Sequence, residues 1–152
     1  MSSIEFFYCN DKRYAEVKKI RTSVFTNEQG ADSQTEFDEY DEFALFALLY
    51  EDGTAVGTAR IAKTPCGYKI GRIAVSKECR GKGYGAVIVN SVTEKAFSFG
   101  ADKVFVDAQN YAVSFYEKLG FTVNGSEIYD RGLPHIPMII LKKDFDDTLG
   151  DE

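Results

Sequence analysis

The sequence contains no tryptophan, one histidine, three prolines and three cysteines among its 152 residues. Cys9, Cys66 and Cys79 are scattered and form no C-x-x-C pair, so they indicate neither a zinc site nor a disulfide framework. Basic residues are the minority, with 18 Lys and Arg against 24 Asp and Glu and a formal net charge of −6. This charge argues against binding to nucleic acid or to an anionic membrane, because both need a basic surface.

No apolar run reaches the roughly 18 residues that cross a bilayer, and the first residues lack the basic and apolar regions of a secretory signal. Because the cysteines suit a reducing compartment, we expect a cytoplasmic protein. Aromatic residues are plentiful, with twelve Phe and nine Tyr. A chain of this length can bury a sizeable core as one domain. We expect that domain over residues 1–145, followed by an acidic tail at 146–152.

The central feature of the sequence is the segment 69–99, where a strand pattern leads through a glycine turn into a helix pattern. The strand pattern ends at Val75, and Gly81, Gly83 and Gly85 precede the helix. The start of a helix has unpaired N–H groups and a partial positive charge. Because glycine lets an anion approach the backbone closely, the turn is a candidate phosphate site.

Arg80 and Lys82 add two cations to this turn. The spacing matches neither the Walker motif, which needs Gly-Lys-Ser/Thr, nor the dinucleotide fingerprint G-x-G-x-x-G. The alternative interpretation is a tight turn that requires glycine only for its backbone angles. The glycine pattern by itself leaves both interpretations open.

Hydrophobic periodicity predicts a strand, a helix, an acidic connector, three strands, the glycine turn with its helix, a strand, a short helix and further strands. The hairpin signal Asp52-Gly53 makes the three central strands an antiparallel meander. The strand after the long helix should pair in parallel with the strand before the turn. The expected fold is therefore mixed α/β, a mostly antiparallel central sheet with one parallel pair, flanked by helices. The predicted helices are 12–25, 83–99 and 111–119, the predicted strands are 4–8, 43–50, 55–62, 68–75, 103–108, 121–123, 128–129 and 136–141, and residues 131–134 are a predicted loop.

The connector at residues 27–42 is acidic and contains no Lys or Arg. One interpretation is a solvated loop or a short surface helix. The other is one wall of a site for a cationic substrate, because negative potential concentrates cations. Its acidic residues are Glu28, Asp32, Glu36, Asp38, Glu39, Asp41 and Glu42.

Several of these segments resemble motifs of one family. Arg80-Gly81-Lys82-Gly83-Tyr84-Gly85 after Ile73-Ala74-Val75 resembles motif A of the GNAT superfamily of N-acetyltransferases, written Q/R-x-x-G-x-G/A. Asn110 with residues 115–121 resembles motif B, and residues 21–29 and 132–138 are similar to the ElaA-like and YjcF-like branch. The resemblance covers nearly the whole chain. It implies the GNAT fold, acetyl-CoA as the donor, an amine as the acceptor and no metal.

The resemblance also implies roles for individual residues. Main-chain groups of the turn would hold the diphosphate of acetyl-CoA with Arg80 beside them, and the main chain before the turn would hold the pantetheine arm. Asn110 would contact pantetheine, with a helix cap as its alternative role. Tyr116 matches the general acid of the family, with a core aromatic as the alternative. The expected cofactor-binding residues are Ile73, Ala74, Val75, Arg80, Gly81, Lys82, Gly83, Tyr84, Gly85, Ala86, Asn110 and Tyr116.

An amine acceptor is mostly an ammonium ion at pH 7, so it must lose a proton before it attacks. Some family members carry a glutamate for this purpose on the strand before motif A, where this sequence has Gly71. His135 and Glu28 are the replacements we consider, because histidine titrates near neutral pH. His135 can equally fix the loop at residues 132–137. Arg21, Arg72 and Asp41 are further candidates that can equally be ordinary ion-pair partners.

The sequence therefore predicts direct acetyl transfer from acetyl-CoA to a primary amine, with Tyr116, His135 and Glu28 as candidate catalytic residues. We expect a cationic small-molecule or peptide acceptor, and dimers are common in the family. One alternative is a non-catalytic CoA-binding sensor or interaction domain on the same fold, which would need the glycine turn but no acid or base. A Rossmann-type nucleotide enzyme is disfavoured by the three antiparallel strands before the turn.

Overall fold

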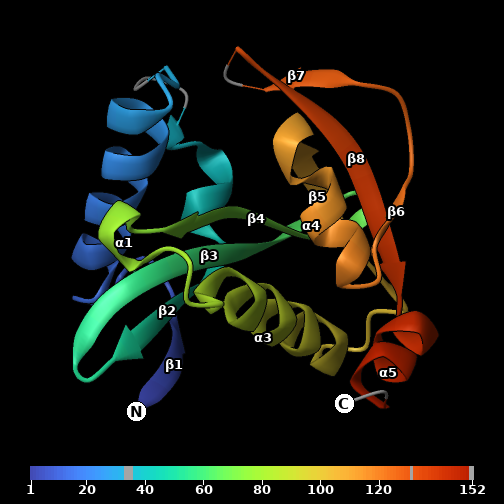
Figure 1. The fold of residues 1–152 in the computed structure, drawn as a ribbon, viewed down its shortest axis with the longest axis horizontal. Coiled ribbons are helices and arrows are strands. Elements are labelled where there is room, and N and C mark those ends of the chain that lie inside the picture. Colours follow the sequence, from blue (N-terminus) through green and yellow to red (C-terminus); the bar gives the residue numbers. More distant parts are fainter. Residues whose placement is uncertain (33–35, 131, 151–152) are drawn as a thin grey trace.

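The computed structural model describes residues 1–32, 36–130 and 132–150. Its centre is an eight-stranded sheet in the order β1-β2-β3-β4-β5-β8-β6, with β7 also paired to β8 (Figure 1). The pair β4–β5 is parallel and the other pairs are antiparallel, which confirms the predicted sheet. The strands are β1 (Ser2–Phe7), β2 (Leu45–Glu51), β3 (Thr54–Thr64), β4 (Gly67–Val75), β5 (Lys103–Gln109), β6 (Thr122–Val123), β7 (Ile128–Asp130) and β8 (Leu133–Leu141).

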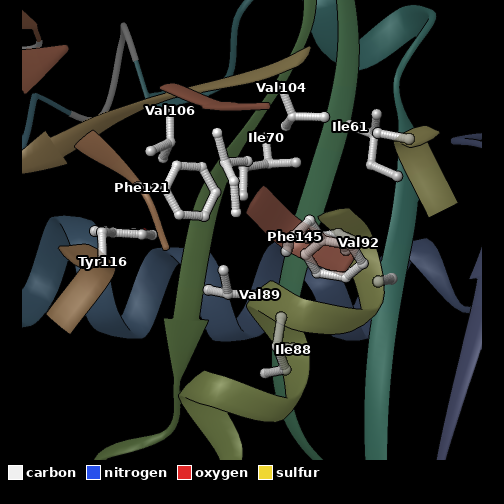
Figure 2. Packing of buried hydrophobic residues seen from close by; sticks show 14 of the residues in the cluster. Ile61, Ile70, Ile88, Val89, Val92, Val104, Val106, Tyr116, Phe121 and Phe145 are labelled. Carbon is white, nitrogen blue, oxygen red and sulfur yellow. The ribbon is translucent and has the colours of Figure 1, made fainter. Parts of the chain in front are cut away.

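Helices cover both faces of this sheet (Figure 1). Alternate residues of a strand point to opposite faces, and in β2 Ala47 joins the cluster under α3, whereas Phe46 and Leu48 join the cluster under α1. Figure 2 shows the first cluster, with Ile88 and Val92 of α3 among its members. The helices are α1 (Tyr14–Arg21), the π-helix η1 (Thr22–Glu28), η2 (Glu39–Glu42), η3 (Lys77–Cys79), α3 (Tyr84–Ser98), η4 (Asn110–Ala112), α4 (Val113–Lys118) and α5 (Lys142–Gly150).

The strands β4 and β5 separate after only two paired positions, Lys69 with Phe105 and Ile70 with Val106. Beyond Ile70, β4 has a register shift against β3, and Arg72 has a positive φ of 48°. A bulge of this kind bends a strand away from its neighbour. The separation leaves the β5-facing edge of the last part of β4 open, directly before the glycine turn.

Two terminal segments differ from the sequence prediction. The expected strand at 136–141 begins at Leu133, so His135 lies in β8 and not in a loop. Residues 146–150 of the expected acidic tail belong to α5, whose Phe145 is buried and contacts the ring of Phe97, and residues 151–152 lie outside the described chain. The sequence analysis missed this helix because most of its residues are charged or polar. One large apolar side chain is nevertheless enough to dock a short amphipathic segment.

Gly57 sets how closely α3 approaches the sheet. A Cβ atom at this position would lie 2.5 Å from Cδ1 of the fully buried Ile88 and 3.0 Å from the carbonyl oxygen of Ala74. We expect Gly57→Ala to lower the free energy of unfolding by about 1–3 kcal/mol, because an overpacked core must shift. Gly71→Ala is the matched control, since its Cβ would meet nothing within 4 Å. Urea denaturation of both variants tests this, and equal stabilities would contradict it.

Candidate functional site

Two cavities meet in the opening between β4 and β5. The large cavity has a volume of about 470 Å³ and the small cavity about 300 Å³. Both are lined by the same four residues, Gly71, Arg72, Asp107 and His135, which form the junction of the two cavities. The large cavity is further lined by the glycine turn, Phe25, Phe115 and Tyr116, and the small cavity by Asp38, Tyr40, Arg60, Lys69, Tyr129 and Asp130.

The glycine turn forms one end of the large cavity. Gly81 and Gly83 have φ angles of 81° and 82°, so the backbone-angle interpretation accounts for both. Gly85 has no positive φ, and its small size is therefore not required by the backbone angle. No side chain caps the N-terminus of α3, where Gly83 is the N-cap residue. The first N–H groups of α3 are thus available to an anion in the cavity.

Arg80 is paired with Glu28, which η1 brings to the glycine turn. Arg80 Nη2 donates to Glu28 Oε1 at 2.7 Å, a second contact joins Nη1 and Oε2, and Nε donates to the Val75 carbonyl at 3.1 Å. The Arg80 guanidinium lowers the pKa of Glu28. A carboxylate whose pKa is lowered holds a proton less readily, which makes Glu28 a poorer base than an isolated glutamate.

Three other predicted cofactor residues lie outside the described lining of the large cavity: Ala74, Lys82 and Asn110. Ala74 is buried in the cluster under α1, and its neighbours Ile73 and Val75 line the cavity. The exposed Asn110 donates from Nδ2 to Glu127 Oε2 at 2.9 Å, and its side chain caps neither η4 nor α4. Contacts of Lys82 and Asn110 with a cofactor stay predictions.

Tyr116 of α4 is both a core residue and a lining residue of the large cavity. Its ring packs edge-on against Phe115 and Phe121, with centroids 5.1 and 5.6 Å away (Figure 2). Burial raises the pKa of the phenol well above its usual value. The hydroxyl therefore stays protonated at neutral pH, as a proton donor at this position requires.

His135 is 2% exposed and lines both cavities from β8. Its Nδ1 lies 2.9 Å from the Leu133 carbonyl oxygen. Because a carbonyl can only accept a hydrogen bond, Nδ1 carries a proton, and Nε2 is the ring nitrogen that remains to accept one. Nε2 makes no hydrogen bond within the described part of the chain. This is the arrangement of a proton acceptor.

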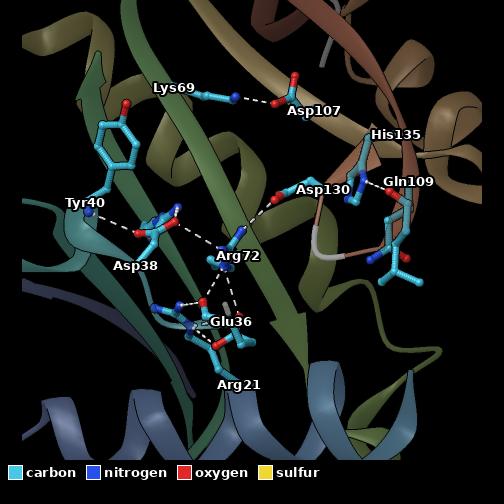
Figure 3. A network of polar contacts seen from close by, with 12 residues as sticks. Arg21, Glu36, Asp38, Tyr40, Lys69, Arg72, Asp107, Gln109, Asp130 and His135 are labelled. Carbon is cyan, nitrogen blue, oxygen red and sulfur yellow. Dashed lines mark hydrogen bonds and ion pairs between the residues drawn. The ribbon is translucent and has the colours of Figure 1, made fainter. Parts of the chain in front are cut away.

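The acidic connector packs against three arginines from other elements, of which Arg21 and Arg72 are labelled in Figure 3. Arg21 contacts Glu36 at 3.1 Å and Asp41 at 2.8 Å, Arg60 contacts Asp41 at 2.9 Å, and Arg72 contacts Glu36 at 3.0 Å. The interpretation as a solvated loop is therefore wrong for Glu36 and Asp41, which are buried. We call Arg21, Glu36, Asp38, Asp41, Arg60 and Arg72 the arginine–carboxylate network.

Asp38 connects this network to the small cavity, with contacts of 2.6 Å to Arg60 and 3.2 Å to Arg72. Burial would raise the pKa of Asp38 and of Asp41, but the neighbouring guanidiniums outweigh it and both pKa values are lowered. Both groups are therefore ionised at neutral pH. Arg21 and Asp41 are ion-pair partners, which was one of their two predicted roles, whereas Arg72 also lines both cavities.

Sequence reasoning missed the polar face of β5. Val104, Val106 and Ala108 are buried, whereas Asp107 and Gln109 alternate with them and line the large cavity. Gln109 Nε2 donates to Gln29 Oε1 at 2.8 Å, which ties this face to the chain after η1. The sequence signal that could have revealed this face is the alternation of Asp107 and Gln109 with apolar residues, in a strand expected to pair with the strand before the glycine turn.

Within the described residues, no group of three or more His, Cys, Asp or Glu side chains is arranged to hold a metal ion. In the same part of the chain, every helix is too short or too polar to span a membrane.

Comparisons with known proteins agree with this fold. The profile of a family described as "Acetyltransferase (GNAT) domain" matches residues 10–142. YyaT of Bacillus subtilis is 34% identical over 126 residues, which are 81% of this chain and 85% of that protein. The uncharacterized N-acetyltransferase YjcF of the same organism is 30% identical over 131 residues, 86% of this chain and 94% of that protein. The crystal structure of Escherichia coli ElaA matches with a TM-score of 0.81 at 25% identity, over 92% of this chain and 99% of that chain.

The chain therefore belongs to the GNAT acetyltransferase family, and the resemblance to the branch of YjcF and ElaA is confirmed. Proteins of this family use an acyl-CoA and an amine acceptor, so the general activity is acyl transfer.

Proposed function

We propose that this protein transfers an acetyl group from acetyl-CoA to a primary amine by direct attack, without a covalent enzyme intermediate. The observation that carries the proposal is the junction, where a cavity that begins at the glycine turn meets a second cavity beside His135. Two reactants can enter such a site from opposite sides and meet between β4 and β5.

The glycine turn would hold the diphosphate of acetyl-CoA on the free N–H groups at the start of α3. The pantetheine arm would lie along β4, whose pairing with β5 ends at Ile70. The main chain at Ile73 and Val75 then has no strand partner on that side, and an extended ligand can hydrogen-bond to such an edge. The Val75 carbonyl already accepts from Arg80 Nε, so its N–H group is the one left for the ligand. This arrangement would bring the acetyl group to the junction.

The residues at the junction suit both proton transfers. Nε2 of His135 would take a proton from the acceptor ammonium, and the amine lone pair would then attack the thioester carbonyl carbon. Collapse of the tetrahedral intermediate breaks the C–S bond, and the Tyr116 hydroxyl would give its proton to the leaving thiolate. The attacking nitrogen of the intermediate carries a positive charge, and it loses one proton to water as the neutral amide forms. His135 then releases its proton to solvent, and Tyr116 regains a proton from solvent.

The alternative is a protein that binds CoA on the same fold without catalysis. Release of CoA thiol from acetyl-CoA in the presence of a broad panel of primary amines distinguishes the two, together with calorimetric titration with CoA. Thiol release that depends on the amine supports the enzyme. Heat of CoA binding without any thiol release would favour the alternative, and no heat at all would contradict both.

Two conservative variants distinguish whether His135 or Glu28 is the general base. We expect His135→Gln to lower kcat by about 100-fold, because a general base contributes about 10²–10⁴. Glu28→Gln should act on binding, since it releases the Arg80 guanidinium for the diphosphate, and we expect CoA to bind about threefold tighter. Steady-state kinetics and CoA titration measure both quantities. If Glu28→Gln abolished turnover at saturating acetyl-CoA and His135→Gln did not, the assignment of the base would be reversed.

A further inference from the structure

Every described cation that lines the small cavity has a carboxylate partner. Arg60 and Arg72 belong to the arginine–carboxylate network, in which three arginines face three carboxylates. The remaining cation, Lys69, is paired with Asp107 (Figure 3). Asp130, which contacts Arg72 at 3.4 Å, adds one more acid to the lining. Among the described residues, the lining of the small cavity therefore has as many carboxylates as cations and no surplus of positive charge.

Asp107 lies at the junction and lines both cavities. Its side chain is 16% exposed, and its Oδ2 forms the ion pair with Nζ of Lys69. Within the described chain, Oδ1 has no hydrogen-bond donor and no further cation beside it. This leaves one carboxylate oxygen able to accept a hydrogen bond from a molecule in the cavity.

Asp107 and His135 are placed to act on the same group. Asp107 and Gln109 are two residues apart in β5 and point to the same face, and Gln109 is directly opposite His135 in β8. Asp107 Oδ1 and His135 Nε2 thus have no partner among the described residues, and both belong to residues that line the junction. An ammonium ion has three N–H groups in different directions and can donate to both.

On the basis of the proposed function, we infer that Asp107 Oδ1 holds the acceptor ammonium beside His135, and that the acceptor is a small aliphatic amine without an acidic group. An acidic group on the acceptor would enter a cavity whose cations are already paired and would meet Asp38 and Asp130. A volume of about 300 Å³ suits a small molecule or a single extended chain.

Asp107 acts before the chemical step, because a hydrogen bond to Oδ1 orients the ammonium while Nε2 of His135 removes one of its protons. The neutral amine then attacks with a lone pair already directed by the remaining N–H···Oδ1 bond. Asp107 is therefore a specificity-determining residue that contacts the substrate, and the proton itself goes to His135.

Three amines of matched length test the acceptor class: n-butylamine, 1,4-diaminobutane and 4-aminobutanoate. With the wild-type protein and acetyl-CoA, we expect kcat/KM for the first two to exceed that for 4-aminobutanoate by about 30-fold or more, because an unpaired charge in a desolvated site costs about 2 kcal/mol. Equal use of 4-aminobutanoate would overturn the inference while leaving acetyl transfer established. If the wild type released no thiol with these or any other amine, the proposed function itself would fail.

The variants Asp107→Asn and Asp102→Asn test the residue. Asp102 is an exposed aspartate outside the lining of both cavities and serves as the matched control. We expect Asp107→Asn to raise the KM for the best of the three amines by about tenfold or more, since a hydrogen bond to a charged group contributes about 1.5–3 kcal/mol. The Kd for CoA should stay within about twofold, which shows that the fold and the donor site are intact.

The preference among the three amines is the readout that a purely structural role would not change. We expect Asp107→Asn to reduce the preference for n-butylamine over 4-aminobutanoate, because it removes one of the three carboxylates, Asp38, Asp107 and Asp130, that line the small cavity and repel an acidic group. An unchanged KM and an unchanged preference, with CoA binding retained, would overturn the inference. If Asp107→Asn failed to fold, Lys69→Gln would test the role of Asp107 instead, because it removes the ion pair and leaves both carboxylate oxygens able to accept from the ammonium. A higher KM for n-butylamine in Lys69→Gln would contradict the role of Asp107.

Discussion

Tyr116→Phe is expected to lower kcat by about 100-fold while the Kd for CoA stays within about twofold. The hydroxyl is the only group lost, and general acid catalysis contributes about 10²–10⁴ to a rate. The ring keeps its packing against Phe115 and Phe121, so the wall of the large cavity is preserved. A loss in kcat without a loss in binding identifies an interaction made in the transition state.

Tyr14→Phe is the matched control, because Tyr14 packs against Phe46 with ring centroids 4.8 Å apart and lies outside the described lining of both cavities. Chemistry must be rate-limiting for this comparison, so single-turnover release of CoA thiol should be measured beside steady-state rates. If Tyr116→Phe retained the wild-type single-turnover rate, Tyr116 would be only a core aromatic and the thiolate would receive its proton from elsewhere.

Arg21→Met is expected to lower the free energy of unfolding by about 3–5 kcal/mol, because it leaves buried carboxylates without their partner. The Arg21 side chain is 1% exposed, and its partners Glu36 and Asp41 are 0% and 8% exposed. Lys142→Met removes the exposed i,i+4 pair between Lys142 and Asp146 and should cost less than about 0.5 kcal/mol. Urea denaturation at neutral pH measures both, and similar losses in the two variants would contradict the importance of burial.

The same network gives stability a dependence on pH. The pKa values of Asp38 and Asp41 are lowered in the folded state, with burial opposing and the arginines outweighing it. Their contribution is therefore present above the pKa of an unfolded aspartate, about 3.9, and is lost as the pH falls through the lower folded values. We expect the wild type to lose stability more steeply than Arg21→Met below about pH 4, because the variant has already lost part of this contribution.

The network also explains why the acidic connector misled sequence reasoning. Its acids looked like a surface for cations because no Lys or Arg lies between residues 27 and 42. Arg21, Arg60 and Arg72 approach from α1, β3 and β4, and they neutralise Glu36, Asp38 and Asp41. The expectation of a cationic acceptor therefore no longer depends on the connector as a whole, of which Asp38 and Tyr40 line the small cavity. It now depends on Asp107, a residue of β5.

Local pattern was sufficient for the strand, glycine turn and helix at residues 69–99, for the parallel pair β4–β5 and for the family. These features follow from hydrophobic periodicity and from the conformational freedom of glycine, and both can be recognised from residues that are close together in the sequence. The position of Tyr116 on the short helix after β5 was likewise available from a motif of contiguous residues.

The placement of Asp107 and His135 at one junction, the pairing of Glu28 with Arg80 and the burial of Glu36 and Asp41 in the connector were decided only by the tertiary structure. Each joins side chains from separate elements, so it depends on strand register, on the bulge at Arg72 and on which faces the helices cover. Sequence alone thus predicted where a thioester carrier would be held. Only the folded sheet determined which acids and bases surround the reacting amine, because a side chain's electrostatic partners are set by packing in space and not by its neighbours along the chain.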